Sequence, residues 1–303
     1  MTQLHPVSGT PDQGLRRYDA AAAQTARLVL RTYSTSFGWA TRLLAQDLRP
    51  HIAAIYGLVR VADEIVDGPA HAAGLDTCAR RALLDHLEGE VAMARSGGYS
   101  SNLIVHAFAR TANQFDIGED LIEPFFASLR ADLTLVRCTQ AEFDQYVYGS
   151  AEVIGLMCLR VFVKGRGHDG PAQRHQVADL EKGARSLGAA FQKINFLRDL
   201  GEDTVVLGRS YFPGVVNGVL DEDQKTKIIS SIHADLDAAE SAIRLLPRGA
   251  RPAVTTAWRL FAELTDRLER VAASQLIEKR IRVPNLIKAR IVARALFESR
   301  CGT

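Results

Sequence analysis

Cysteine is scarce in this chain of 303 residues, which contains four. Cys78, Cys138, Cys158 and Cys301 are scattered and form no C-x-x-C pair, the spacing typical of zinc and redox sites. This pattern argues against a disulfide or zinc framework. It indicates reduced thiols in a cytoplasmic protein.

The sequence also lacks long hydrophobic runs and basic blocks. Residues 1–13 are polar, without the apolar core of a signal peptide, and no later stretch reaches the length of a membrane span. The formal net charge is +2 and basic residues are not interleaved with aromatic ones, so nucleic acid is not expected as a partner. No amphipathic anchor stands out, but the pattern is compatible with peripheral contact with the inner face of the cell membrane.

Alternating strand patterns are nearly absent, whereas helical periodicity is widespread. The chain is 47% hydrophobic, which is enough to bury a large core. Apolar residues recur at helical spacing in residues 52–66, 103–115, 121–135, 177–200, 228–246, 254–268 and 286–297. We therefore expect one all-α domain over residues 15–303, preceded by a disordered segment over residues 1–14.

One acidic motif lies in the segment 60–67. Residues three and four apart are neighbours on a helix, so Tyr56, Arg60, Asp63 and Asp67 would form one polar line beside an apolar stripe. Taken alone, an Asp-x-x-x-Asp pattern is common on solvated helix surfaces.

A second acidic motif lies in the segment 192–203. Gln192, Asn195, Asp199 and Asp203 would share one helix face, and the flanking residues are strongly apolar. Burying unpaired carboxylates among such residues costs several kcal/mol each, so a solvated surface does not explain this line well.

The two acidic lines explain each other if their helices face across a cavity. Two carboxylates about 4 Å apart repel by roughly 4 kcal/mol even at an effective dielectric near 20. The candidate ligands are all hard oxygen donors, which favours Mg²⁺ over zinc or copper. Because Mg²⁺ in proteins binds through a few carboxylates and substrate phosphates, the pattern suits a long hydrocarbon that carries a diphosphate.

At these residues the chain resembles the squalene/phytoene synthase family, and it is most similar to actinobacterial phytoene synthases. The motifs that carry the resemblance are Y-S-T-S-F at 33–37, Y-x-x-x-R-x-x-D-x-x-x-D at 56–67, Y-V-Y-G-S-A at 146–151, the run 192–203 and G-R-S-Y-F-P at 208–213. The resemblance implies an all-α, single-domain isoprenoid synthase of the class I terpenoid synthase type, a helical bundle around a central cavity.

The implied activity is the head-to-head condensation of two geranylgeranyl diphosphates, through a cyclopropyl (prephytoene) diphosphate, to phytoene. This is the first committed step of carotenoid biosynthesis, and a carotenoid desaturase would consume the product. The reaction ends in proton loss, so NADPH is not expected. The alternatives are a dehydrosqualene or squalene synthase acting on farnesyl diphosphate and, in a different class, a non-catalytic assembly factor of the same fold.

The resemblance also implies roles for particular residues. The ligands of Mg²⁺, which Mn²⁺ could replace, would be Asp63, Asp67, Asn195, Asp199 and Asp203. Contacts to diphosphate or to the reacting prenyl head would come from Ser34, Thr35, Ser36, Tyr56, Arg60, Gln192, Arg198 and Arg280. Tyr146 would lie beside the reacting carbons.

The sequence departs from the family pattern at three positions. Glu152 adds a carboxylate near the Tyr146 motif, Phe261 stands where relatives often have tyrosine, and Val66 stands where some relatives have an acid. Glu64 is a candidate to supply that acid. Thr41 is small for a pocket floor, which favours a C20 over a C15 substrate.

Two further segments allow alternative interpretations. The irregular stretch 204–218 contains Arg209 and Tyr211 and is either a lid over diphosphate or a structural turn. The sequence G-R-G-H-D-G at 165–170 fits a dinucleotide-binding pattern and follows the strand-like residues 161–163. A parallel sheet and a suitably placed acidic residue are both lacking around it, so a loop is the favoured interpretation over an oxidoreductase.

Overall fold

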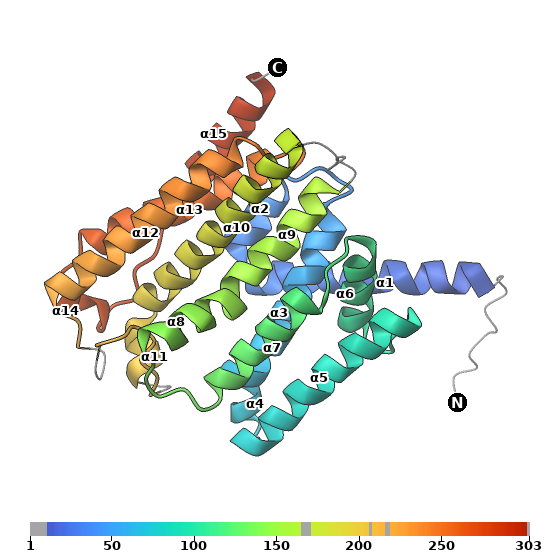
Figure 1. The fold of residues 1–303 in the computed structure, drawn as a ribbon, viewed down its shortest axis with the longest axis horizontal. Coiled ribbons are helices and arrows are strands. Elements are labelled where there is room, and N and C mark those ends of the chain that lie inside the picture. Colours follow the sequence, from blue (N-terminus) through green and yellow to red (C-terminus); the bar gives the residue numbers. More distant parts are fainter. Residues whose placement is uncertain (1–10, 165–170, 206–207, 216–218, 302–303) are drawn as a thin grey trace.

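The computed structural model describes residues 11–164, 171–205, 208–215 and 219–301, and these residues form a helical bundle (Figure 1). In the first half the helices are α1 (Pro11–Tyr33), α2 (Thr35–Thr41), α3 (Arg49–Asp67), α4 (Pro69–Ala72), α5 (Thr77–Gly97), α6 (Leu103–Gln114) and α7 (Glu119–Asp132). In the second half they are α8 (Gln140–Val147), the π-helical segment η1 (Tyr148–Glu152), α9 (Val153–Val163), α10 (Pro171–Arg198), α11 (Leu200–Val205), α12 (Glu222–Ile243), α13 (Arg251–Glu269), α14 (Ala273–Leu276) and α15 (Asn285–Cys301).

The periodic segments predicted from the sequence are all helical, in α3, α6, α7, α10, α12, α13 and α15. Extended pairing is confined to isolated bridges in the described ranges, such as the one between Arg137 and Ser210. The strand-like interpretation of residues 161–163 is wrong, because these residues end helix α9. Residues 165–170, which fit the dinucleotide pattern, lie outside the described residues.

The N-terminal boundary also differs from the expectation. Helix α1 begins at Pro11 rather than near Leu15, so residues 11–14 belong to the helix. Asp12 lies in the first turn, where a negative charge is favourable, and its carboxylate pairs with Arg16 at 2.6 Å. Residues 1–10 lie outside the described part of the chain.

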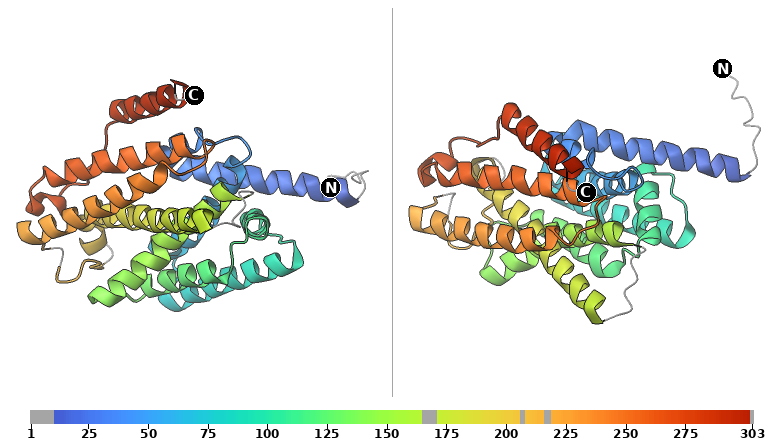
Figure 2. Two further views of the ribbon diagram at one scale, coloured as in Figure 1. Left: turned by 45° about the horizontal axis from the view of Figure 1, so that its top comes forward. Right: turned by 90° about the horizontal axis from the view of Figure 1, so that it is seen from above.

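Two apolar clusters form most of the core. One joins α1, α3, α5, α6, α7 and α9, and the other joins α8, α10, α12 and α13. Helix α10 packs against α9, η1, α12 and α13, and α1 packs against α3 and α6 (Figures 1 and 2). This arrangement places the predicted acidic faces, on α3 and at the end of α10, on opposite sides of the space between the clusters.

Glycines allow α10 to approach the η1–α9 segment closely. A Cβ atom at Gly188 would lie 2.5 Å from the carbonyl oxygen of Ala151, and one at Gly155 would lie 2.4 Å from the carbonyl oxygen of Ala184. No larger residue fits at either position without moving a helix backbone. The close contact fixes the helix that carries Tyr146 against the helix that carries the second acidic motif.

The continuous helical segment Gln140–Val163 is long and apolar enough to cross a membrane by length and composition. The sequence analysis did not find such a stretch. In the structure this segment lies inside the bundle, where η1 and α9 pack against α3, α7 and α10. Its apolar composition is therefore explained by the core.

Candidate active site

One cavity of about 660 Å³ brings most of the predicted site residues together. Its polar end is lined by Tyr56, Arg60, Asp63, Asp67, Tyr146, Gln192, Asn195, Arg198, Asp199, Asp203 and Arg280. Its other walls are apolar and come from α2, α3, α9, α10, α12 and α13. The two acidic helix faces therefore meet at one end of a largely apolar cavity, as the sequence predicted.

On the α3 side, arginines accompany both acidic residues. Asp67 accepts a hydrogen bond at 2.7 Å from the guanidinium of Arg209, which is buried. Arg60 donates to Glu64 at 3.1 Å, and the Tyr56 hydroxyl lies within hydrogen-bonding reach of Arg60. Glu64 does not line the cavity, so it does not supply the acid that Val66 replaces.

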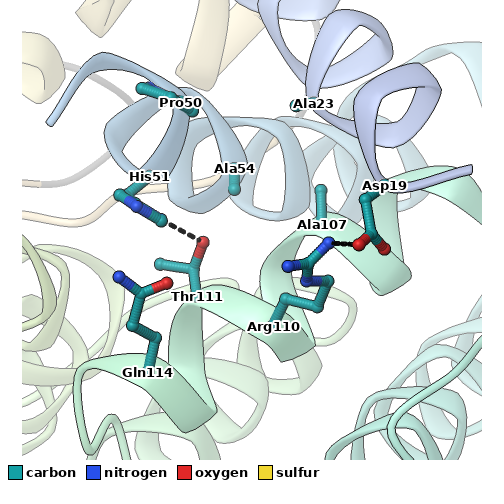
Figure 3. A pocket seen from close by; sticks show the side chains of 9 residues that line it. All are labelled: Asp19, Ala23, Pro50, His51, Ala54, Ala107, Arg110, Thr111 and Gln114. Carbon is teal, nitrogen blue, oxygen red and sulfur yellow. Dashed lines mark hydrogen bonds and ion pairs between the residues drawn. The ribbon is translucent and has the colours of Figure 1, made fainter. Parts of the chain in front are cut away.

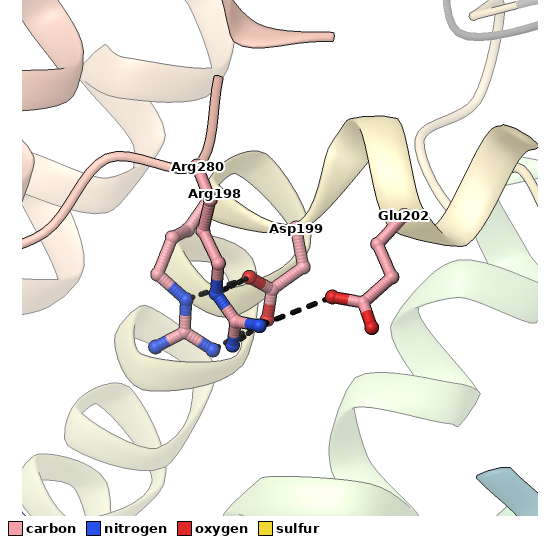
Figure 4. Close-up of polar contacts among 4 residues, drawn as sticks. All are labelled: Arg198, Asp199, Glu202 and Arg280. Carbon is pink, nitrogen blue, oxygen red and sulfur yellow. Dashed lines mark hydrogen bonds and ion pairs between the residues drawn. The ribbon is translucent and has the colours of Figure 1, made fainter. Parts of the chain in front are cut away.

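On the opposite side, Asp199 lies at the junction between α10 and α11 and is held by two arginines (Figure 4). Its Oδ1 accepts from Nε of Arg198 at 2.8 Å and lies 2.9 Å from Nε of Arg280. Arg280 also pairs with Glu202 at 3.0 Å, and Glu202 lines the cavity although the sequence analysis did not select it. Arg280 lies in the segment before α15, and it is about 80 residues away from Asp199 in the sequence.

The carboxylates of one acidic face raise the pKa of carboxylates on the other. Burial raises the pKa of Asp203 to about 7, and Asp199 and Asp67 add to the increase. Burial likewise raises the pKa of Asp63 to about 8, although Arg60 opposes the shift. Asp67 is on α3 and Asp203 on α11, so a negative charge on one helix disfavours a negative charge on the other.

This electrostatic arrangement predicts that the metal-free protein loses stability as the pH rises. The folded protein binds protons at Asp63 and Asp203 up to pH 7–8, whereas unfolded aspartate has a pKa near 3.9. Between these values the folded state binds more protons, so its free energy of unfolding falls with increasing pH. Urea denaturation in EDTA between pH 5 and 8.5 measures the slope, which should be shallower in Asp63→Asn. Parallel slopes for the two proteins would contradict this description of Asp63.

Asp132 is a buried acid that the sequence analysis missed. Its carboxylate accepts hydrogen bonds from the hydroxyl of Tyr146 at 2.6 Å and from the hydroxyl of Tyr211 at 2.9 Å. Arg209 donates to the Tyr211 hydroxyl at 3.2 Å, which links Asp132 to Asp67. The sequence did contain a signal for Asp132, because it is an aspartate at the end of an apolar periodic segment. A carboxylate buried at such a position needs polar partners.

The shifts of pKa within this network keep Tyr146 protonated. Burial, followed by the charge of Asp132, raises the pKa of Tyr146 well above its ordinary value. Burial raises the pKa of Asp132 to about 7, and Arg209 opposes the increase. Tyr146 therefore presents a neutral, hydrogen-bonded phenol at the wall of the cavity.

The segment around Arg209 is packed rather than open. Arg209, Ser210, Tyr211 and Phe212 are buried, and the Ser210 hydroxyl donates to the carbonyl oxygen of Val215 at 2.6 Å. Of the two interpretations of residues 204–218, the structure shows an ordered turn over residues 208–215 whose arginine binds the acidic site. Residues 206–207 and 216–218 lie outside the description.

Of the sequence-selected residues 34–36, only Ser34 has a described side chain, and it does not line the cavity. The Ser34 hydroxyl oxygen accepts from the backbone N–H of Phe37 at 3.1 Å, and it caps helix α2. The side chains of Thr35 and Ser36 lie outside the described part of the structure. Ser34 is within hydrogen-bonding reach of Tyr56, so it adjoins the site without lining the cavity.

The departures from the family pattern have structural explanations. Glu152 lies outside the cavity lining and accepts a hydrogen bond from Arg185 at 2.6 Å. Phe261 stacks on Phe191 with ring centroids 3.8 Å apart and an interplanar angle of 18°. Phe191 lines the cavity, so Phe261 acts through packing against a wall residue.

The donor set fits a hard divalent cation. Among the described His, Cys, Asp and Glu residues, the group with three donor atoms within 4.8 Å of one another is His233, Asp266 and Glu269, outside the cavity. No three carboxylates of the described cavity lining come this close to one another, and arginines pair with Asp67 and Asp199. Ligands beyond these carboxylates, such as phosphate oxygens, would have to complete the shell of an ion held there.

A comparison with protein families identifies the chain. The squalene/phytoene synthase model matches residues 30–286, which include both acidic faces, Asp132 and Tyr146. The chain belongs to the squalene/phytoene synthase family. The resemblance inferred from the sequence motifs is thereby confirmed.

Known relatives of this squalene/phytoene synthase family member support the assignment. It is 32% identical to a 15-cis-phytoene synthase of Synechocystis, covering 82% of this chain and 77% of that protein. It is 27% identical to an actinobacterial phytoene synthase, that of Mycobacterium bovis, covering 90% of each. A crystal structure of a dehydrosqualene synthase superposes with a TM-score of 0.73 at 20% identity, covering 96% of this chain and 99% of that one. This similarity confirms the predicted all-α terpenoid synthase fold.

A second, smaller pocket of about 170 Å³ lies between α1, α3 and α6 (Figure 3). Its polar side chains already bind one another: His51 contacts the Thr111 hydroxyl at 3.0 Å, and Arg110 pairs with Asp19. These contacts account for its charged groups and for His51 and Thr111 without a ligand, and the remaining polar residue, Gln114, is exposed.

Proposed function

We propose that this protein is a phytoene synthase that joins two geranylgeranyl diphosphates head to head. The observation that carries the proposal is the cavity, because its polar end combines two facing acidic helices with three arginines and its remaining walls are apolar. Such a cavity suits a substrate with a highly charged head and a long hydrocarbon chain. The phytoene synthases among its relatives support this choice over squalene and dehydrosqualene synthesis.

The proposed metal is Mg²⁺, with Mn²⁺ as a substitute. Its protein ligands would be oxygen atoms of Asp63, Asp67, Asn195, Asp199 and Asp203, and the bound ions would neutralise the charge of the departing diphosphate. Arg60, Arg198 and Arg280 would donate hydrogen bonds to diphosphate oxygens, which requires the pairs of Arg198 and Arg280 with Asp199 to rearrange. The remaining proposed contacts to the prenyl diphosphates come from Ser34, Thr35, Ser36, Tyr56 and Gln192.

The reaction proceeds in two halves. The carbon–oxygen bond of one diphosphate breaks, the allylic cation adds to the double bond of the second substrate, and proton loss closes a cyclopropane ring. The second diphosphate then leaves, the ring rearranges, and a further proton is lost to give a central triene. No hydride is consumed, so the proposed reaction does not use NADPH.

Tyr146 is the residue proposed to act on the cationic intermediates. Its hydroxyl donates to Asp132 at 2.6 Å, and its side chain lines the same cavity as Asp63 and Asp67. A phenol fixed in this way can stabilise a nearby carbocation through its ring and its oxygen, and can assist proton removal. Asp132 and Tyr211 act as positioning residues in this proposal.

Small residues in the cavity wall favour the C20 substrate. Thr41 and Ala40 come from α2, and Ala184 and Gly183 come from α10. Their short side chains leave room for a longer hydrocarbon than bulky residues at the same places would allow.

Product analysis tests the proposed function. The protein is incubated with Mg²⁺ and either farnesyl or geranylgeranyl diphosphate, with and without NADPH. We expect phytoene from the C20 substrate, in the same amount with and without NADPH. Dehydrosqualene as the preferred product would assign the C15 substrate, squalene formed only with NADPH would assign a reductive enzyme, and no product with either substrate would indicate an assembly factor.

The proposed product also suggests where the protein acts. A C40 hydrocarbon is insoluble in water, so we propose a cytoplasmic protein that contacts the inner face of the cell membrane peripherally. An enzyme that desaturates the hydrocarbon, such as a carotenoid desaturase, would take the product from there.

A further inference from the structure

The outer face of α15 carries large apolar side chains that the rest of the structure leaves uncovered. Leu286 is 75% exposed and Phe297 is 69% exposed. They are eleven residues apart, which is close to three helical turns, so they lie on the same face. Ala289 and Ala293 lie between them on this face and are exposed too.

The opposite face of α15 attaches the helix to the bundle. Ala295 is buried, and α15 packs on α13 and α2. Figure 2 shows α15 as the outermost helix on its side of the bundle. Its uncovered face is therefore part of the outer surface of the protein.

The same segment is strongly basic. Residues 279–297 contain no aspartate or glutamate, and their six basic residues are Lys279, Arg280, Arg282, Lys288, Arg290 and Arg294. Arg280 pairs with Asp199 and Glu202, and Arg294 pairs with the flanking Glu298, so within the described residues the charge outside ion pairs comes from Lys279, Arg282, Lys288 and Arg290. The whole chain has a formal net charge of +2, so positive charge is concentrated here. Arg290 and Arg294 lie on α15 beside the exposed apolar residues, at the spacing of a helical turn.

This basic segment is continuous with the cavity. Arg280, at its beginning, pairs with Asp199 in the polar end of the cavity, and α15 follows directly after residue 284. A surface bound by α15 would thus lie next to the segment that closes one side of the candidate active site.

We propose that the outer face of α15, together with the basic residues 279–294, docks this protein on an anionic lipid bilayer. Apolar side chains that enter the interface, combined with lysine and arginine beside acidic headgroups, are the chemistry of peripheral membrane binding. The proposal deepens the proposed function and rests on it for its purpose, since a bilayer would supply the prenyl substrate and receive the hydrocarbon. The docking surface itself stands on exposure and charge alone.

Vesicle sedimentation with the full chain tests the docking surface. Vesicles of phosphatidylcholine with phosphatidylglycerol should bind the protein at low salt, and vesicles of phosphatidylcholine alone should bind it at least tenfold more weakly. The double variant Leu286→Ser/Phe297→Ser and the double variant Arg282→Gln/Arg290→Gln should each lower binding about tenfold. Their targets are exposed, so folding should be unaffected, which circular dichroism checks.

A matched control replaces exposed apolar residues elsewhere on the surface. Leu28 on α1 and Met93 on α5 are each 64% exposed, and Leu28→Ser/Met93→Ser should bind vesicles as the unmodified protein does. Equal binding to neutral and anionic vesicles, or unchanged binding by both α15 variants, would overturn the proposal. A dimer without lipid that Leu286→Ser/Phe297→Ser abolishes would instead assign the face to a second copy of the chain.

The assay separates this inference from the proposed function. Turnover of detergent-dispersed geranylgeranyl diphosphate should be equal in the unmodified protein and the α15 variants. A protein that binds anionic vesicles as expected but forms no phytoene would refute the proposed function and leave the docking surface intact. Phytoene formation by a protein that does not bind vesicles would refute the docking surface and support the proposed function.

Discussion

Asp63→Asn is expected to reduce kcat for phytoene formation by about a thousandfold, equivalent to ~4 kcal/mol of lost transition-state stabilisation. The carboxylate lies at the polar end of the cavity, and burial raises its pKa to about 8 although the charge of Arg60 opposes the shift. Removing the charge weakens metal binding, while the amide has the same shape. The fold should survive, and the metal-free protein should be at least as stable as the unmodified one.

Steady-state kinetics over a range of Mg²⁺ concentrations measures this effect. Glu64→Gln is the matched control, because Glu64 is the neighbour of Asp63 on α3, pairs with Arg60 and does not line the cavity. It should retain kcat within about threefold. Normal product formation by Asp63→Asn at ordinary Mg²⁺ concentrations would remove Asp63 from the metal site.

Tyr146→Phe is expected to lower kcat about a hundredfold, while KM changes by less than about threefold. The phenol hydroxyl donates to Asp132 and is buried at the cavity wall, so its loss affects the reacting carbons more than the diphosphate. Asp132→Asn should lower kcat by about tenfold, since it weakens the hold on Tyr146 without removing the phenol. Steady-state kinetics gives kcat and KM for both variants. Single-turnover experiments then separate the chemical steps from product release.

Tyr148→Phe provides the control on the same helical segment. The Tyr148 ring lies outside the cavity lining, against the guanidinium of Arg185 at 5.3 Å from the ring centroid. Its hydroxyl should not contribute, so kcat should be unchanged. Equal kinetics for Tyr146→Phe and the unmodified protein would exclude the Tyr146 hydroxyl from the reaction.

The helices and the acidic faces were accessible from sequence because both follow the helical repeat. Asp63 and Asp67, and Asp199 and Asp203, are each one turn apart, so local periodicity places each pair on one face. Whether the two faces meet depends on the packing of α3 against the rest of the bundle. Such packing joins parts of the chain that are distant in sequence, and helical periodicity gives no information about it. The expectation that the two faces meet came from the resemblance to the family.

Asp132 shows what periodicity leaves out. It ends a mainly apolar helix and looks like a polar residue at a helix terminus, whereas its partners Tyr146 and Tyr211 lie 14 and 79 positions further along the chain. Arg209 is similar, because its pairing with Asp67 joins residues 142 positions apart. Such networks become visible only when the backbone brings their members together.

The outer face of α15 was missed for another reason. Apolar residues occur on both faces of this helix, and arginines stand among the exposed ones, so the sequence shows no clear separation into a polar and an apolar side. The packing of Ala295 and Ile287 against the bundle distinguishes the covered face from the one with Leu286 and Phe297. For this reason no membrane anchor was predicted from the sequence.

Metal binding measures directly whether the two acidic faces share metal ions with a diphosphate. Mn²⁺ bound to the protein is counted by electron paramagnetic resonance with inorganic pyrophosphate present, for the unmodified protein, Asp67→Asn on α3 and Asp203→Asn on α11. We expect pyrophosphate to strengthen Mn²⁺ binding, and each single substitution to abolish most of that gain. Pyrophosphate-dependent binding that persists unchanged when either face is altered would contradict a shared site.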